Sequence, residues 1–183
     1  MEPHAPDEAL YARVKRGDLG AFDELYARHS RKLFFYLRAQ LPTPADAEDV
    51  MHEAILATLE SREVTFDRGS FRTWLYRIAR NRVLNRHRSQ GRGQGALARI
   101  QAETSEAPPA VDDRIAREEL LRALDGAVGR LPPTLAELYH LRSSGMSYEE
   151  MAAVVGIPLG TIKSRMNQLV ELLRKELSPW TAR

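Results

Sequence analysis

The chain has 183 residues, 43% of them hydrophobic, which is enough for compact cores in one ordinary domain or two small ones. It contains no cysteine, which excludes disulfides and thiolate metal sites. The net charge is only +2, yet residues 71–100 carry eight arginines and no acid, whereas residues 42–63 hold six acids against one arginine. No apolar run approaches the roughly 18 residues of a membrane span, and the first residues lack the features of a signal peptide. We therefore expect a soluble, cytoplasmic protein with no membrane insertion.

Apolar residues recur at helical spacing along almost the whole chain, and the alternation of half-buried strands is nearly absent. The predicted fold class is all-α, with about nine helices in two small helical bundles joined by a flexible linker. From Asp7 onward we expect two helices that are broken near residues 17–20. Their buried stripe is predicted to contain Leu25, Leu33, Tyr36, Leu37 and Leu41.

An acidic helix is expected over residues 45–59, with Thr43 or Asp46 as its cap. Its core-facing side is predicted to hold Val50, Ala54 and either Ile55 or Leu56. Its polar side carries the carboxylates of Asp46, Glu48, Asp49 and Glu53. Two interpretations remain open for this side: a solvated face, or a docking surface for a basic partner.

The basic segment is predicted to form a helix over residues 71–88, with Ser70 as its N-cap. Arginines hold phosphates, aromatic rings stack on bases and amides read base edges, so this composition suits a nucleic-acid strand. The alternative is a solvated helix, and part of it must hold, because Trp74, Leu75, Ile78, Ala79 and Val83 have core spacing. A solvated helix usually mixes acids with bases, however, so the lack of acids favours nucleic-acid binding.

A helix-turn-helix pattern follows a segment rich in Ala, Glu, Ser and Pro at residues 94–111, which has the composition of a linker. In residues 147–166, Ser147 and Glu150 form a capping box, Gly156 lies at the turn, and Ile162 and Met166 would pin the second helix. The exposed side of that helix would present Thr161, Lys163, Ser164, Arg165, Asn167 and Gln168. These donors and acceptors suit a major groove; the alternative is an ordinary helical hairpin.

No constellation of catalytic or metal-binding residues is present in the sequence. His52-Glu53 begins like a zinc-protease motif, but Leu56 stands where the second histidine would be. The five histidines form no ligand-spaced pair. We therefore expect no enzyme activity, no catalytic residue, no metal and no cofactor.

Three segments, DAEDVMHEAILATL, GSFRTWLYRIARNRVLNRHR and GMSYEEMAAVVGIPLGTIKSRMNQLVELLRKEL, resemble in this order the bacterial sigma factors of the extracytoplasmic-function (ECF) type. The resemblance covers nearly the whole chain, from about Glu8 to Leu177. It implies an alternative sigma factor that binds core RNA polymerase, directs it to promoter DNA and helps to melt the minus-ten region. The implied domains are region two (7–92), a linker (93–111) and region four with the helix-turn-helix (112–183).

In region two, the resemblance implies that the acidic helix docks on the polymerase through Asp46, Glu48, Asp49 and Glu53. The loop at residues 61–69 would take a flipped base of the minus-ten element, with Phe66 as one wall of the pocket. Asn81 and Asn85 match positions that help to form this pocket. The strands would be held and separated by Trp74, Arg77, Arg80, Arg82 and Arg86.

In region four, the recognition helix would enter the major groove at the minus-thirty-five element. The implied base-reading residues are Lys163, Ser164, Asn167 and Gln168, and the implied phosphate contacts are Thr161 and Arg165. Relatives commonly carry a bulky or basic pair where this chain has Asn167 and Gln168. The apolar side formed by Leu169, Val170, Leu172 and Leu173 is either core or a surface for a regulator, typically an anti-sigma factor in this family.

Two other classes of function compete with the sigma factor. A stand-alone repressor or activator would bind duplex DNA through the helix-turn-helix, as a dimer on a palindrome, which leaves the acidic and basic helices without a role. An RNA-binding or antitermination protein would use the arginine-rich helix and leave the helix-turn-helix unexplained.

Overall fold

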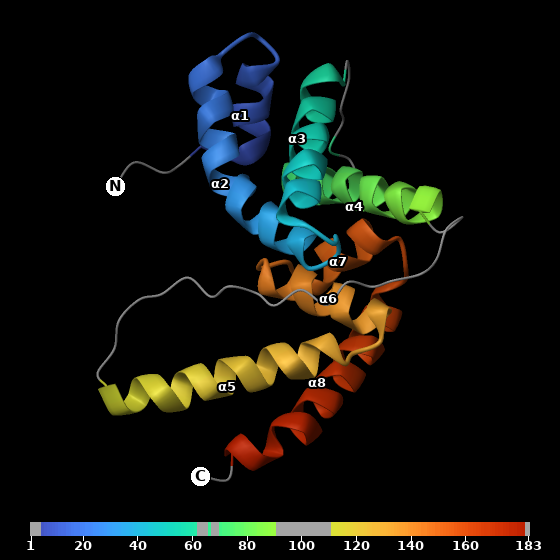
Figure 1. The fold of residues 1–183 in the computed structure, drawn as a ribbon. Helices are drawn as coiled ribbons and strands as arrows, with labels where there is room; N and C mark the ends of the chain where they lie inside the picture. Colours follow the sequence, from blue (N-terminus) through green and yellow to red (C-terminus); the bar gives the residue numbers. More distant parts are fainter. Residues whose placement is uncertain (1–4, 62–65, 67–69, 91–110, 182–183) are drawn as a thin grey trace.

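The computed structural model describes residues 5–61, 66, 70–90 and 111–181 (Figure 1). These residues form helices and no strand, as the apolar periodicity predicted. The described helices number eight rather than about nine. They are α1 (Asp7–Val14), α2 (Leu19–Arg38), α3 (Pro44–Glu60), α4 (Phe71–Gln90), α5 (Val111–Gly129), α6 (Pro133–Ser143), α7 (Tyr148–Val155) and α8 (Leu159–Thr181). None of them is long and apolar enough to cross a bilayer.

The first four helices form an N-terminal bundle, in which α1 and α2 make a hairpin beside α3, and α4 crosses the lower end of α3 (Figure 1). Gly17, with a φ of 88°, lies at the predicted break between α1 and α2. The predicted buried stripe is confirmed, because all five of its members are at most 5% exposed: Leu25, Leu33, Tyr36, Leu37 and Leu41.

Helix α3 begins where its capping residues predicted. Thr43 is the N-cap, and its Oγ1 accepts a hydrogen bond from the Asp46 amide at 3.0 Å. Val50 and Ala54 are buried, as predicted. Of the two candidates for the third core position, Ile55 packs against the core, whereas Leu56 is 55% exposed.

The last four helices form a C-terminal bundle, and the helix-turn-helix is its α7–α8 pair. The predicted capping box of Ser147 and Glu150 is present at the start of α7. Gly156 ends α7 with a φ of 78°, a left-handed conformation that glycine adopts without a steric cost. Ile162 and Met166 are buried and fix α8 to the core. Each of these features follows from local sequence.

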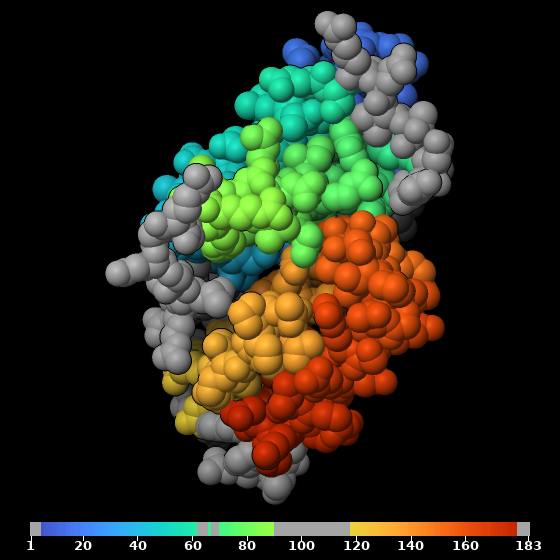
Figure 2. All heavy atoms as spheres, turned by 90° about the vertical axis from the view of Figure 1, so that its right-hand side faces the viewer, coloured from blue at the N-terminus to red at the C-terminus, as the bar shows by residue number. Residues whose placement is uncertain are grey.

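The two bundles pack directly against each other. Helix α4 lies on α7, and α2 contacts α6 (Figures 1 and 2). Buried residues of α1–α4 and of α6–α8 form one continuous hydrophobic cluster, in which the rings of Tyr36 and Tyr76 lie 5.2 Å apart. The sequence predicted two bundles joined by a flexible linker at residues 93–111 and did not specify how the bundles pack. Residues 93–110 of this linker lie outside the described residues, and Val111 is the first residue of α5.

Candidate nucleic-acid interface

The basic helix α4 is fixed at its first turn by two side chains. The Ser70 Oγ accepts a hydrogen bond from the Thr73 amide at 3.3 Å, as expected of an N-cap. The Glu8 Oε1 of α1 accepts one from the Phe71 amide at 2.8 Å. A carboxylate at this end also favours the helix dipole, so α4 starts at a well-defined position.

One side of α4 is core. Leu75, Ala79 and Val83 are at most 2% exposed, and Ile78 packs against the core. The expected core spacing of these apolar residues is therefore confirmed.

Two predicted strand-contacting aromatics, Trp74 and Phe66, belong to an aromatic cluster between α1 and α4. Ring centroids lie 5.5 Å apart for Trp74 and Tyr11, 6.1 Å for Trp74 and Phe66, and 5.8 Å for Phe66 and Tyr11. Both residues are partly exposed. Each side chain therefore packs in the cluster and keeps part of its surface open to solvent.

The outer side of α4 carries exposed polar residues at helical spacing. Asn81 and Asn85 are exposed one turn apart, and Arg77 and Arg82 are exposed beside them. Amides and guanidinium groups on one open face are able to reach the base edges and phosphates of a strand. The remaining predicted loop residues, 62–65 and 67–69, lie outside the described part of the chain.

The predicted polymerase-docking acids and DNA-binding arginines are direct neighbours. Arg86 Nη1 lies 2.7 Å from Asp46 Oδ1, and its Nη2 lies 3.6 Å from Asp49 and 3.7 Å from Glu53. Arg82 Nη1 lies 3.4 Å from Glu53. The acidic and basic stretches therefore partly neutralise each other across the α3–α4 contact, and Glu48 stays exposed on the outside.

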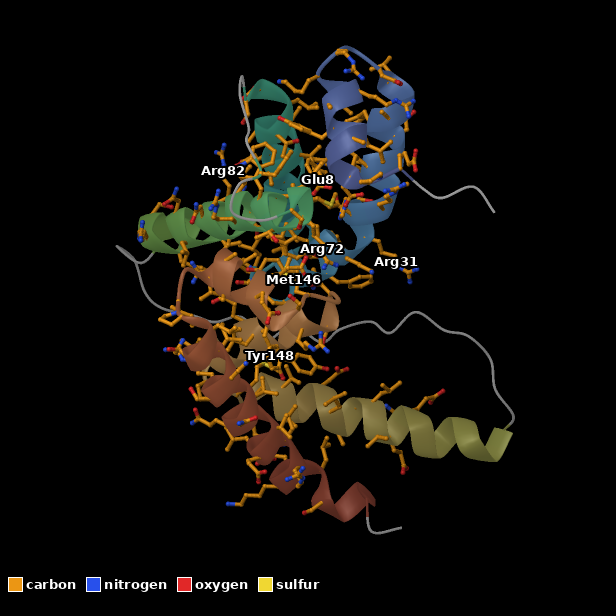
Figure 3. The ribbon with its side chains drawn as sticks, turned by 180° about the vertical axis from the view of Figure 1, so that it is seen from behind. Glu8, Arg31, Arg72, Arg82, Met146 and Tyr148 are labelled. Carbon is orange, nitrogen blue, oxygen red and sulfur yellow. The ribbon has the colours of Figure 1, made fainter. Side chains whose placement is uncertain are left out.

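Two further arginines of α4 bind carboxylates of the C-terminal bundle. Arg80 Nε donates to Glu137 Oε1 at 2.6 Å, and Arg72 donates to both oxygens of Glu150. Figure 3 shows Arg72 at the junction, close to Met146 of the C-terminal bundle. Burial raises the pKa of the Glu150 carboxyl, but hydrogen bonds from Arg72 and the Ser147 amide outweigh it and hold the pKa below its ordinary value. Arg80 is thus engaged with protein in this arrangement.

The recognition helix presents its polar side to solvent. The predicted base-reading residues Lys163, Ser164, Asn167 and Gln168 are exposed. Thr161 and Arg165, the predicted phosphate contacts, are partly exposed. This arrangement leaves the candidate duplex-reading surface open, whereas the α4 surface is partly covered.

The apolar side of α8 is mostly core. Leu169 is 2% exposed, and Leu172 and Leu173 pack against the core cluster, whereas Val170 is 44% exposed. The described residues contain no group of acids and histidines that could hold a metal ion. Sequence reasoning missed Glu8 and Glu137, and it identified Glu150 only as a cap, because their partners lie more than fifty residues away.

Comparisons with known proteins match both halves of the chain. The family model described as "Sigma-70 region 2" matches residues 25–93, and "Sigma-70, region 4" matches residues 121–173. The Escherichia coli "ECF RNA polymerase sigma-E factor" is 31% identical over 188 residues, covering 98% of each chain. The Pseudomonas aeruginosa "RNA polymerase sigma-H factor" is 31% identical over 182 residues, covering 94% of each.

Two solved structures share the fold. CnrH, in complex with the cytosolic domain of CnrY, has a TM-score of 0.67 and 27% identity over 94% of this chain and 97% of its own. The sigma factor RpoE of Bartonella quintana, in complex with the anti-sigma factor NepR, has a TM-score of 0.61 and 24% identity. It covers 85% of this chain and 95% of its own and supports the fold alone.

Proposed function

Because this chain belongs to the sigma-70 family as an ECF-type sigma factor, we propose that α3 docks on core RNA polymerase, α4 captures the minus-ten strand and α8 reads the minus-thirty-five duplex. The protein is a transcription initiation factor and not an enzyme: it directs RNA polymerase to specific promoters. The proposed domains are region two at residues 7–92, a linker at 93–111 and region four at 112–183.

The observation that carries the minus-ten assignment is the pair Asn81 and Asn85. Both amides are exposed one helical turn apart, on a helix whose other exposed side chains are mainly arginines. An unstacked base held by amide hydrogen bonds and stacking offsets a few kcal/mol of lost base pairing. Arg77, Arg82 and the partly exposed Trp74 would hold the phosphates and bases beside it. Melting in this proposal draws on binding energy alone, with no hydrolysis.

We assign the loop at residues 61–69 to the flipped base, with Phe66 as one wall. Phe66 and Trp74 share the aromatic cluster with Tyr11. Partly exposed aromatic side chains at this place offer surface against which a base is able to pack. Arg80 and Arg86 would reach DNA only after releasing Glu137 and the α3 carboxylates.

Polymerase docking is assigned to the outer side of α3. Glu48 and Asp49 are exposed there, while Asp46 and Glu53 are partly engaged with Arg86. Carboxylates that a neighbouring arginine already orients are able to meet a basic surface without large rearrangement. In region four, Lys163, Ser164, Asn167 and Gln168 would read bases, and Thr161 and Arg165 would hold phosphates.

The packed arrangement must open before both promoter elements are contacted at once. The centres of elements at minus ten and minus thirty-five are about 25 base pairs apart, or roughly 85 Å at about 3.4 Å per base pair. Helices α4 and α7 are in direct contact, and α8 follows α7 after a short turn. We propose that core polymerase binds the open form, in which α4 and α7 have separated.

An anti-sigma factor is the proposed regulator, acting in the cytoplasm where the polymerase works. CnrH is 27% identical to this chain, and its structure contains the cytosolic domain of CnrY. Val170, which is 44% exposed on α8, is the proposed contact for such a partner.

Tethered DNA cleavage tests the two DNA assignments in one complex. The chain has no cysteine, so Ser89→Cys on α4 and Glu171→Cys on α8 each give a single attachment point for an iron chelate. In holoenzyme on a promoter that it transcribes, the first label should cut near the minus-ten element and the second near minus thirty-five. Cleavage by both labels at the same element would refute the assignment.

A further inference from the structure

Helix α1 and its C-cap residue present three side chains that contact the α3–α4 connection: Glu8, Tyr11 and the C-cap Lys15. Their spacing of three and four residues, with Lys15 still in the α conformation, places them on one side of the helix. All three reach toward the connection between α3 and α4, which is the proposed minus-ten loop.

Lys15 holds the end of α3. Its Nζ donates to the carbonyl oxygens of Leu59 at 2.9 Å and Ser61 at 2.6 Å. Carbonyl groups in the last turn of a helix lack partners within the helix, and a cation there also complements the helix dipole. The Lys15 ammonium group therefore fixes the backbone at the point where the connection leaves α3.

Glu8 holds the start of α4. Its Oε1 accepts the Phe71 amide at 2.8 Å, and Phe71 itself is buried. Figure 3 shows Glu8 beside this first turn. The amide belongs to the group of helix N–H donors that have no partner within the helix, so Glu8 satisfies a donor that would otherwise be buried without one.

Tyr11 lies between Glu8 and Lys15 and contacts the end of α3, the connection and the start of α4. Its hydroxyl donates to the Thr58 carbonyl at 2.8 Å, and its ring lies 5.4 Å from Phe71 and 5.8 Å from Phe66. Burial raises the pKa of Tyr11, so the hydroxyl remains a donor at neutral pH. Phe66, in the connection itself, thus packs on an α1 side chain.

We propose that α1 is a positioning element for minus-ten recognition: Glu8, Tyr11 and Lys15 fix both ends of the α3–α4 connection and the ring of Phe66. The proposal rests on the function assigned above to α4 and this connection. A pocket that discriminates between bases has to be held in place by contacts behind it. The side chains of α1 supply such contacts without touching the bases in this assignment.

Lys15 offers a clean test because its side chain is exposed. Lys15→Met keeps the length of the side chain and removes the donor, while Lys15→Arg keeps a donor. Arg16→Met is the matched control, since it removes the same charge from the exposed neighbouring residue. Glu8→Ala and Glu8→Gln form a second pair, in which only glutamine retains an oxygen acceptor for the Phe71 amide.

Two measurements decide the outcome. In the free protein, the Ser61 amide, which donates to the Ala57 carbonyl at 3.2 Å, should exchange with solvent faster in Lys15→Met than in Arg16→Met or Lys15→Arg. In holoenzyme, the ratio of opening rates on promoters with the correct and a substituted minus-ten base should fall roughly three- to ten-fold. Glu8→Ala should lower the same ratio, and Glu8→Gln should restore most of it.

Equal loss of activity on both promoters, with an unchanged ratio and unchanged exchange, would overturn the proposal, because a purely structural role lowers output without changing base preference. If wild-type holoenzyme itself shows no preference at minus ten, the assignment of the pocket fails instead. In that case the exchange rates still decide whether α1 anchors the connection.

Discussion

Arg72 of α4 donates to both carboxylate oxygens of Glu150 in α7, at 2.6 Å each, while the same carboxylate accepts the Ser147 amide at 2.8 Å. The Glu150 side chain therefore caps the first helix of the helix-turn-helix and also binds that helix to α4. Arg80, about two helical turns after Arg72 on α4, makes a second such link to Glu137 of α6. Both pairs join α4 to the C-terminal bundle.

Neutralising both acids should favour the open form. Glutamine preserves the capping box at position 150, so Glu137→Gln with Glu150→Gln removes charge without removing the cap. Each partly exposed pair contributes roughly 1 kcal/mol. Dyes on Leu56→Cys and Lys175→Cys should report a longer distance in this variant by energy transfer. As a control, Glu176→Gln breaks the Arg130 pair within the C-terminal bundle and should leave the distance unchanged. An unaltered distance in the double variant would show that the Arg72–Glu150 and Arg80–Glu137 pairs do not hold the packed form.

Removing the two exposed amides of α4 should impair promoter opening and spare polymerase binding. Asn81→Ala with Asn85→Ala deletes hydrogen bonds worth about 1–3 kcal/mol for each base contacted, so permanganate reactivity of thymines in the melted region should fall at least tenfold. Asn167→Ala with Gln168→Ala is the comparison: it should relax base preference at minus thirty-five. Normal opening by the first variant would refute the pocket.

The structure changes how the docking helix should be tested. Charge reversal at Asp49 or Glu53 would set a lysine against Arg86, 3.6 and 3.7 Å away, and would disturb the bundle itself. Glu48 is exposed on the outer side, so Glu48→Lys should weaken affinity for core polymerase with little change in thermal stability. Glu60→Lys, at the far end of the same helix, should bind normally. Equal affinity of both variants would mean that the outer side of α3 is only solvated.

Region four should lose stability in mild acid because of His140. Burial lowers the pKa of this imidazole to about 4, against an ordinary value of 6.5. The unfolded chain therefore binds a proton between these values that the folded chain does not, and the free energy of unfolding rises with pH across this window. The full span corresponds to roughly 3 kcal/mol. Urea unfolding of His140→Phe between pH 4.5 and 7 should show a clearly smaller pH dependence, and an identical slope would contradict the assignment.

The helices and their ends were predictable from local sequence, whereas the contacts between helices depend on residues far apart in the chain. Thr43, Ser147 and Gly156 mark helix ends through bonds to residues at most four positions away, so their sequence context was sufficient. Arg86 meets Asp46 across 40 positions and Arg72 meets Glu150 across 78, and nothing in the periodicity of one helix specifies a partner in another. For the same reason, the exposed candidates on α8 and the core spacing of Trp74 were predictable, whereas the pairing of Arg80 with Glu137 was not.

Transcription from genomic DNA tests the central claim most directly. Purified protein, bacterial core RNA polymerase and genomic DNA of the source organism would be combined, and the 5′ ends of the transcripts sequenced. We predict discrete new start sites that share two spaced motifs, one for α4 and one for α8. No new starts, together with no binding to core polymerase, would contradict the sigma-factor function and favour a regulator that binds duplex DNA by itself.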